Sequence, residues 1–363
     1  MKSEARRPYN NSMLIEGVFA AVTTPFYPDE RIYFRKIEAN MARYSRSLLA
    51  GIVVLGSTGE SPLLTDAESV EVLRCAAAAT APEKVLIAGV GRESVRATVE
   101  LAEEAAKAQY DAVLVRPPSY YGSLRNNAAQ LHYFRCVADR SPLPVLLYNV
   151  PKCVPQEIPV EVVAELAGHP NIIGIKDSSG SVERIKAQVE ATKGAAKRTV
   201  TVTPVFEAVT GRMLAPNPEP QGSFVAAGDL AAGSAVATAP PVPALKTRSR
   251  EVGFQVLCGT ASVILDALQA GAAGGVLAFA SFAPEACQEV YLAWKDHDPK
   301  LAADKQQRIA GANRRIVGEL GIGGVKYACD FNGYYGGRPR LPLVAATAAQ
   351  RAEIEGLRAE IRN

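Results

Sequence analysis

The sequence predicts an α/β protein: a (β/α)8 (TIM) barrel with a C-terminal helical extension and a long insertion before the seventh strand. Two observations predict it. Short apolar segments recur along the chain, most of them continuously apolar, as in strands buried on both faces. Longer amphipathic segments separate them, which is the pattern of a parallel barrel. The expected strands are Val18–Thr23, Gly51–Leu55, Val85–Val90, Ala112–Arg116, Pro144–Asn149, Ile172–Lys176, Phe254–Cys258 and Gly275–Ala280.

The segments between these strands have helical character. Thr65 is followed three residues later by Glu68, which is the pattern of a capping box at a helix start. A doubly wound sheet is the alternative, but no GxGxxG motif follows a strand to support a dinucleotide site. The expected helices are Thr65–Ala79, Ser94–Gln109, Asn126–Arg140, Val160–Ala167 and Val182–Lys193.

The predicted domain organisation is a barrel at residues 14–283, interrupted at about 195–253, and a helical region at 284–363. The interruption is rich in Pro, Gly, Ala and Thr, and a loop of this length inside a compact domain signals an insertion. Because it follows a helix and precedes a strand, we expect it on the barrel face away from the chemistry. The alternation in Thr199–Phe206 suggests a strand within it.

The composition and charge of the chain argue against several classes of protein. The 363 residues include 40 Lys and Arg against 37 Asp and Glu, and this balance argues against nucleic acid or an anionic membrane as the main partner. No stretch reaches the ~18 apolar residues of a membrane span, and residues 1–13 lack a secretory signal's apolar core. The six cysteines and three histidines are scattered, so we expect no metal site and no cofactor. The sequence indicates a cytoplasmic protein.

Two strand ends carry candidate catalytic residues, because catalytic groups of such barrels lie at the carboxyl ends of strands. Lys176 ends the sixth strand, where desolvation would lower its pKa as a Schiff-base lysine requires. The alternative is a structural lysine, paired for example with Asp177. Tyr148 ends the neighbouring fifth strand and would lie near Lys176, where its phenol could transfer protons. Its alternative is an aromatic at the rim of the core.

Two loops add binding candidates. Ser57 and Thr58 lie between glycines after the second strand, and their hydroxyls with exposed amides suit a carboxylate, although an ordinary glycine turn would look similar. Tyr120 and Tyr121 follow the fourth strand and could contact substrate, a neighbouring subunit or their own loop. Together these residues predict lysine-dependent chemistry on a 2-oxo acid.

A series of motifs carries a resemblance to a known family. Read in order, they resemble the dihydrodipicolinate synthase / N-acetylneuraminate lyase family, from Glu16 to about Pro342 outside the insertion. Within it the chain is most similar to 4-hydroxy-2-oxoglutarate aldolases, through His169–Ile172, Phe254–Leu257 and Gly333–Gly337. The family motifs are Gly17–Phe26, Gly56–Glu60, Ala88–Gly91, Tyr148–Pro151, Gly174–Gly180, Val256–Gly259 and Gly271–Val276.

The resemblance implies a Schiff-base (class I) lyase acting on pyruvate or a pyruvyl group, usually as a homo-oligomer, a dimer or tetramer. Lys176 would form the imine and Tyr148 would shuttle protons. Ser57 and Thr58 would hold the 2-oxo acid carboxylate and help relay protons. Tyr121, with Tyr120 as the alternative, would reach a neighbour's site. Backbone carbonyls lining the pocket would come from Gly259 and Val276.

One position departs from the family pattern. In dihydrodipicolinate synthases an arginine follows the YNVP motif by two residues and binds the aldehyde's carboxylate, whereas this chain has Cys153 there, beside Lys152. A thiol cannot replace a bidentate guanidinium. The expected reaction is therefore cleavage of a 4-hydroxy-2-oxo acid, such as 4-hydroxy-2-oxoglutarate, to pyruvate and glyoxylate. Alternatives are condensation of pyruvate with aspartate semialdehyde, another sugar-acid aldolase or dehydratase, and a catalytically silent 2-oxo acid binding protein.

Overall fold

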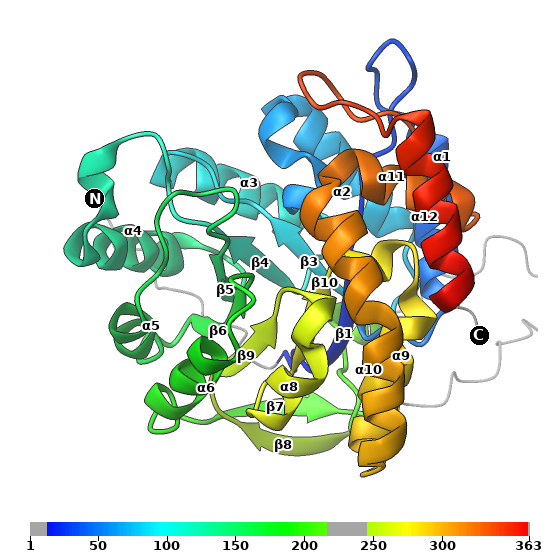
Figure 1. Ribbon diagram of the computed structural model, residues 1–363. Helices are drawn as coiled ribbons and strands as arrows, with labels where there is room; N and C mark the ends of the chain where they lie inside the picture. Colours follow the sequence, from blue (N-terminus) through cyan, green and yellow to red (C-terminus); the bar gives the residue numbers. More distant parts are fainter. Residues whose placement is uncertain (1–12, 216–244, 362–363) are drawn as a thin grey trace, which may run out of the picture.

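The computed structural model describes residues 13–215 and 245–361 and confirms the barrel (Figure 1). Eight parallel strands close in the order β1-β10-β9-β6-β5-β4-β3-β2. Each overlaps an expected strand, although the first and the last end two and three residues earlier than expected, at Ala21 and Leu277. The strands are β1 (Gly17–Ala21), β2 (Gly51–Val54), β3 (Val85–Gly89), β4 (Ala112–Val115), β5 (Val145–Asn149), β6 (Ile172–Asp177), β9 (Gln255–Cys258) and β10 (Gly274–Leu277).

Helices surround the barrel and cover the outer face of its strands. At the start of α2 the Thr65 hydroxyl accepts a hydrogen bond from the Glu68 backbone, and the Glu68 carboxylate accepts one from the Thr65 backbone, which confirms the capping box. The barrel helices are α1 (Phe34–Ser45), α2 (Asp66–Ala79), α3 (Val95–Lys107), α4 (Asn127–Arg140), α5 (Val160–Leu166), α6 (Val182–Ala191), α8 (Ile264–Gln269) and α9 (Pro284–Lys295).

The barrel strands are buried along their whole length, which explains why their sequences do not alternate. Side chains such as Phe19, Leu114 and Leu146 fill the interior, while their neighbours in sequence pack outward against the helices. Close approach between strands depends on glycine at Gly174, where a Cβ atom would lie 2.3 Å from the backbone oxygen of Gln255.

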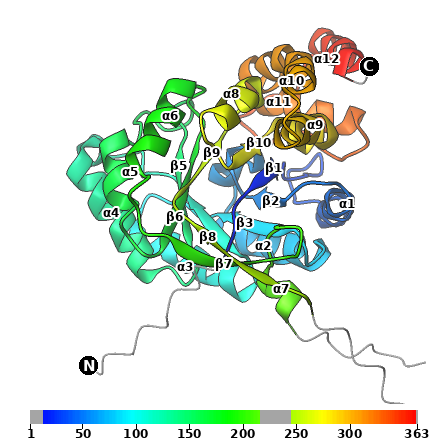
Figure 2. The same cartoon turned by 90° about the horizontal axis from the view of Figure 1, so that it is seen from below.

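The described part of the insertion forms an antiparallel hairpin of β7 (Arg198–Val202) and β8 (Arg248–Val252), with the short helix α7 (Gly211–Leu214) between them. The strand expected within Thr199–Phe206 is present but ends at Val202. Figure 2 shows the hairpin lying across the lower end of the barrel.

Contacts identify that end of the barrel as the one where the strands begin. Val200 and Val252 pack against Leu14, which precedes β1. The Arg198 guanidinium donates to the Met13 carbonyl and to the side chain of Gln255, the first residue of β9. The expectation that the insertion emerges away from the carboxyl ends of the strands is confirmed for its described residues.

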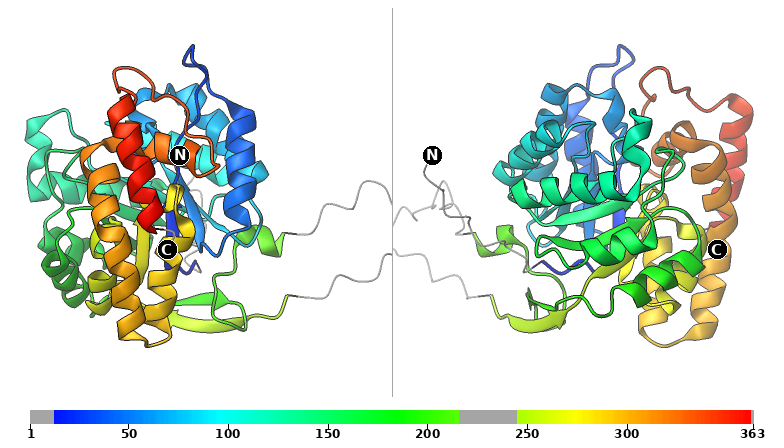
Figure 3. Two further views of the ribbon diagram at one scale, coloured as in Figure 1. Left: turned by 45° about the vertical axis from the view of Figure 1, so that its right-hand side comes forward. Right: turned by 90° about the vertical axis from the view of Figure 1, so that its left-hand side faces the viewer.

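Further helices follow the barrel and stack along one side of it (Figure 3). They are α10 (Pro299–Asn313), a π-helical segment (Arg314–Glu319), α11 (Gly321–Phe331) and α12 (Ala348–Ile361). The expected boundary at residue 284 lies just before α9, which packs against β1 and occupies the place of the eighth barrel helix. None of the helices in residues 13–215 and 245–361 has the length and apolar character needed to cross a bilayer.

Candidate active site

Lys176 and Tyr148 lie side by side at the carboxyl ends of neighbouring strands. The register of β5 and β6 pairs Tyr148 with Lys176, so both side chains project to the same side. The Lys176 ammonium nitrogen lies 4.3 Å from the centre of the Tyr148 ring. Both residues are buried, with 4% and 6% of their surface exposed. The expected proximity of the two side chains is confirmed.

The alternative pairing of Lys176 with Asp177 is wrong. Successive strand residues project to opposite faces, and Asp177 projects outward from the barrel. Its carboxylate accepts hydrogen bonds from Asn149 Nδ2 at 3.0 Å, Arg184 Nε at 2.8 Å and Gln188 Nε2 at 2.7 Å. Asp177 therefore ties the end of β6 to β5 and α6 while Lys176 faces the barrel mouth.

The hydroxyl loop, which we define as Gly56–Glu60, lies against Tyr148. The Ser57 Oγ is 3.4 Å from the Tyr148 hydroxyl, so the two hydroxyls face each other at the outer limit of hydrogen-bond distance. Ser57–Gly59 form a single 3₁₀ turn, and Thr58 within it is buried. The Thr24 hydroxyl donates to the Gly59 carbonyl at 2.7 Å and fixes the turn to the end of β1.

A cavity of about 740 Å³ opens at this end of the barrel. Its lining includes Ser57, Tyr148 and Cys153, and its volume suits a small-molecule ligand. Two arginines that also line it are already bonded within the chain. Arg92 Nε lies 3.1 Å from an Asp66 carboxylate oxygen, and Arg116 is paired with a glutamate.

Comparison with known proteins places the chain among relatives of matching architecture. The sequence model described as the Dihydrodipicolinate synthetase family matches residues 14–198 and 242–360. The chain belongs to this family. The "Probable 4-hydroxy-2-oxoglutarate aldolase, mitochondrial" of Emericella nidulans is 39% identical over 187 residues, covering 49% of this chain and 60% of that protein. The chain thus spans about 60% of the length of this relative.

Two further matches extend over nearly the whole chain. The 4-hydroxy-tetrahydrodipicolinate synthase of Hyphomonas neptunium is 29% identical over 345 residues, covering 94% of this chain and 97% of that protein. A dihydrodipicolinate synthase structure from Bacillus anthracis superimposes with a TM-score of 0.74 at 24% identity, covering 94% and 97% of the two chains. At that identity, the structural match supports the fold alone.

Two family positions expected to supply carbonyls lie in or beside the barrel wall. Val276 is buried on β10, in the same interior cluster as Tyr148. Gly259 follows β9, and a Cβ atom there would lie 2.0 Å from the Ser178 hydroxyl, so only glycine fits beside the end of β6. Their contribution to a substrate pocket stays a prediction.

The two tyrosines after β4 lie on the surface of the described chain. Tyr120 and Tyr121 are exposed, at 79% and 64%, and pack edge to face with their ring centres 5.1 Å apart. Glu93 fixes their loop by accepting from the backbone N–H groups of Ser119 and Tyr120. Neither ring contacts Tyr148 within this single chain's described residues, and a role toward a neighbouring chain stays a prediction.

Sequence reasoning missed two features around the site. One is the anchoring role of Asp177, which the alternation of side chains along a strand could have indicated. The other is a buried ion pair between Glu60 of the hydroxyl loop and Lys326 of α11, with their atoms 2.5 Å apart. No local signal marks that pair, because its members lie 266 residues apart.

Proposed function

We propose that this chain is a Schiff-base-forming lyase that cleaves a 4-hydroxy-2-oxo acid, such as 4-hydroxy-2-oxoglutarate, to pyruvate and glyoxylate. The observation that carries the proposal is the buried Lys176 amine over the Tyr148 ring, with the Tyr148 hydroxyl beside Ser57. Family membership and the name of the Emericella relative support the same reaction class.

The chemistry follows from the two strand-end residues. The neutral Lys176 amine attacks the C2 carbonyl of the substrate, and loss of water gives an imine. The protonated imine accepts the electron pair of the C3–C4 bond while Tyr148 removes the proton of the 4-hydroxyl group. The aldehyde leaves, the resulting enamine takes a proton at C3, and hydrolysis of the imine releases pyruvate and regenerates the amine.

The hydroxyl loop would bind the substrate end common to all 2-oxo acids. Ser57 and Thr58 would donate hydrogen bonds to the C1 carboxylate, and Ser57 would exchange a proton with Tyr148. The carbonyls of Gly259 and Val276 would line the same pocket. No metal or cofactor is required by this scheme, because the iminium group itself withdraws the electrons.

Condensation of pyruvate with aspartate semialdehyde is the second candidate, because the Hyphomonas relative is named for it. Against it stands Cys153, which lines the cavity at the position where the family pattern has an arginine. A thiol gives the second carboxylate no cationic partner. We further propose a homo-oligomer, a dimer or tetramer, working in the cytoplasm.

Trapping with borohydride tests the reaction class. Incubation with pyruvate and borohydride should add one reduced pyruvyl group, found by intact-protein mass and located on Lys176 by peptide mapping. Lys176→Ala should abolish the adduct. The matched control is Lys84→Met, which removes another buried lysine, one bonded to the carbonyls of Ser47 and Leu49. Absence of an adduct on the folded wild-type protein would refute the mechanism.

Pyruvate release tests the substrate. With 4-hydroxy-2-oxoglutarate, lactate dehydrogenase coupling should report steady turnover. Product formation from pyruvate and aspartate semialdehyde, with no cleavage of the hydroxy acid, would favour the second candidate instead.

A further inference from the structure

The hydroxyl loop is bounded on both sides by strained backbone. Leu55, just before it, has a φ of 59°, and Glu60 at its end has a φ of 57°. Side-chain-bearing residues in the left-handed region cost free energy, and such backbone persists only where its surroundings hold it. Something outside the loop must therefore hold Ser57 and Thr58 where they are.

The Glu60 carboxylate supplies that hold. It is buried, with 1% of the residue exposed, and its Oε1 accepts from the Lys326 ammonium at 2.5 Å. The same ammonium donates to the carbonyls of Thr24 at 2.8 Å and Arg338 at 2.9 Å. The other carboxylate oxygen accepts from the Arg340 backbone at 2.8 Å. One lysine thus joins the end of β1, the hydroxyl loop and the C-terminal region.

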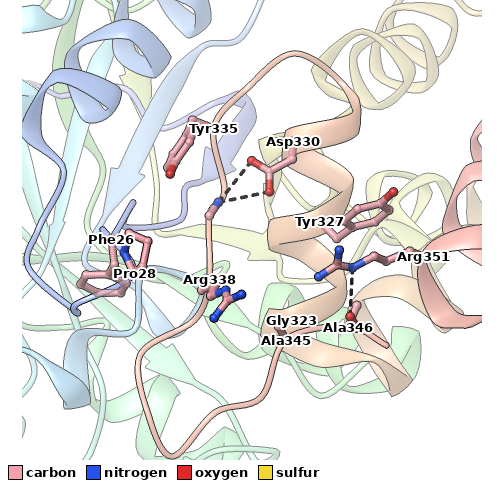
Figure 4. A pocket seen from close by; sticks show the side chains of 11 residues that line it. Phe26, Pro28, Gly323, Tyr327, Asp330, Tyr335, Arg338, Ala345, Ala346 and Arg351 are labelled. Carbon is pink, nitrogen blue, oxygen red and sulfur yellow. Dashed lines mark hydrogen bonds between the residues drawn. The ribbon is translucent and has the colours of Figure 1, made fainter. Parts of the chain in front are cut away.

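The C-terminal segment that the Glu60–Lys326 pair contacts is itself fixed at both ends. We call residues 335–346 the C-terminal strap; Figure 4 shows it passing beside α11, around a cavity of about 240 Å³. Asp330 of α11 accepts from the Gly337 backbone at 3.2 Å, and Arg351 of α12 donates to the Ala346 carbonyl at 3.0 Å. At Gly336 a Cβ atom would lie 2.0 Å from the Lys326 carbonyl, so the strap lies directly on α11.

We propose that Lys326 is a positioning residue for the reaction: through Glu60 it holds the hydroxyl loop in the strained conformation that presents Ser57 and Thr58 to the substrate carboxylate. The inference rests on the proposed function and deepens it. Lys326 touches none of the reacting groups. Its ammonium acts on Glu60, and Glu60 is joined to Ser57 by a backbone hydrogen bond of 3.1 Å.

The desolvation free energy of the buried Glu60–Lys326 pair argues for a positioning role. Both charged side chains are fully buried, and burying an ion pair gains little stability over apolar side chains of similar volume. Burial also lowers the pKa of Lys326 and raises that of Glu60, so the desolvation opposes the pairing. The C-terminal helices have a less costly tie in the exposed pair of Arg315 and Glu353.

The experiment compares Lys326→Met and Glu60→Gln with Arg315→Gln, which removes the tie between the π-helical segment and α12 without touching the hydroxyl loop. The readout is the pyruvate concentration that gives half-maximal borohydride labelling of Lys176. We expect the first two variants to raise it roughly tenfold or more, the effect of losing a hydrogen bond to a charged group, while saturating pyruvate still labels Lys176. Arg315→Gln should leave it unchanged.

A role limited to stability predicts a different result. Lower melting temperatures for Glu60→Gln and Lys326→Met, with half-maximal concentrations within about twofold of wild type, would overturn the proposal. Glu60→Gln keeps the volume of the side chain and one of its two acceptor oxygens. It therefore serves if Lys326→Met does not fold.

Amide hydrogen exchange separates this inference from the proposed function. Residues 55–60 should exchange faster in both variants and at the wild-type rate in Arg315→Gln. If wild type forms no pyruvate adduct at all, the proposed function fails while the exchange result still decides whether Lys326 holds the loop. If residues 55–60 exchange at the wild-type rate in Lys326→Met and Glu60→Gln, Lys326 does not hold the loop.

Discussion

Replacing Asp177 by alanine should destabilise the barrel through groups left unpaired inside it. The carboxylate is fully buried and pairs with Arg184, whose side chain is itself only 14% exposed. It also accepts hydrogen bonds from Asn149 and Gln188. Asp177→Ala leaves the Nε–H of the buried Arg184 guanidinium and two side-chain amides without their acceptor, and water cannot reach them easily.

The expected magnitude follows from those unpaired groups. Removing one member of a buried ion pair costs about 3–5 kcal/mol. For 363 residues the unfolding entropy is about 0.8 kcal/mol/K, so the melting temperature should fall by about 4–6 °C.

Scanning calorimetry checks this against a matched exposed pair. Glu165 pairs with Arg135 on the surface, with side-chain exposures of 51% and 47%. Glu165→Ala should cost at most about 1 kcal/mol, a shift of roughly 1 °C. Equal shifts for Glu165→Ala and Asp177→Ala would refute the reasoning. Asp177→Ala should also slow pyruvate labelling of Lys176, because the end of β6 loses its anchor.

Three further predictions concern the site and the strap. Tyr148→Phe should keep the pyruvate adduct while pyruvate release from the hydroxy acid falls by roughly 10²–10⁴-fold in the coupled assay; a loss below tenfold would contradict a proton-transfer role. Cys153→Arg should raise condensation with aspartate semialdehyde relative to glyoxylate, and an unchanged ratio of initial rates would show that this position does not face the aldehyde. The hydrogen bond from Arg340 lowers the pKa of Glu68 to about 2 from the ordinary 4.5. The folded pKa is the lower one, so Glu68 stabilises the fold above about pH 4.5 and this contribution is lost as the pH falls toward 2. Glu68→Gln should therefore show a shallower decline of melting temperature with acid than wild type, and parallel curves would contradict this.

The barrel and the core of the candidate site were predictable because their signals are local. Strands buried on both faces must be apolar throughout, and eight such runs in regular alternation with helices leave few topologies. Parallel strands end at one side of a barrel, so Lys176 and Tyr148 could be placed together from neighbouring strand ends alone. The alternation in Thr199–Phe206 likewise indicated the first strand of the hairpin, although that strand ends at Val202.

The remaining features depend on contacts that no local pattern encodes. The sequence shows Glu60 as the last residue of a glycine-rich motif but does not predict its ion pair, because its partner Lys326 lies on a helix far along the chain. Glu93 fixes the loop that carries Tyr121, but the role expected for this exposed ring needs a second chain and stays a prediction. Long-range ion pairs and subunit contacts are set by tertiary packing, which residue spacing does not report.

The buried residues Lys326 and Lys176 have different roles because their ammonium groups have different surroundings. The Lys326 ammonium donates to a carboxylate and two carbonyls, so all three of its protons are engaged and it has no electron pair to offer a carbonyl carbon. Within residues 13–215 and 245–361, no carboxylate oxygen lies within 4.0 Å of the Lys176 nitrogen, which faces an aromatic ring instead. The nucleophile that attacks a 2-oxo acid is an amine with its electron pair available. The pyruvyl adduct should therefore form on Lys176 and not on Lys326, although both residues are buried.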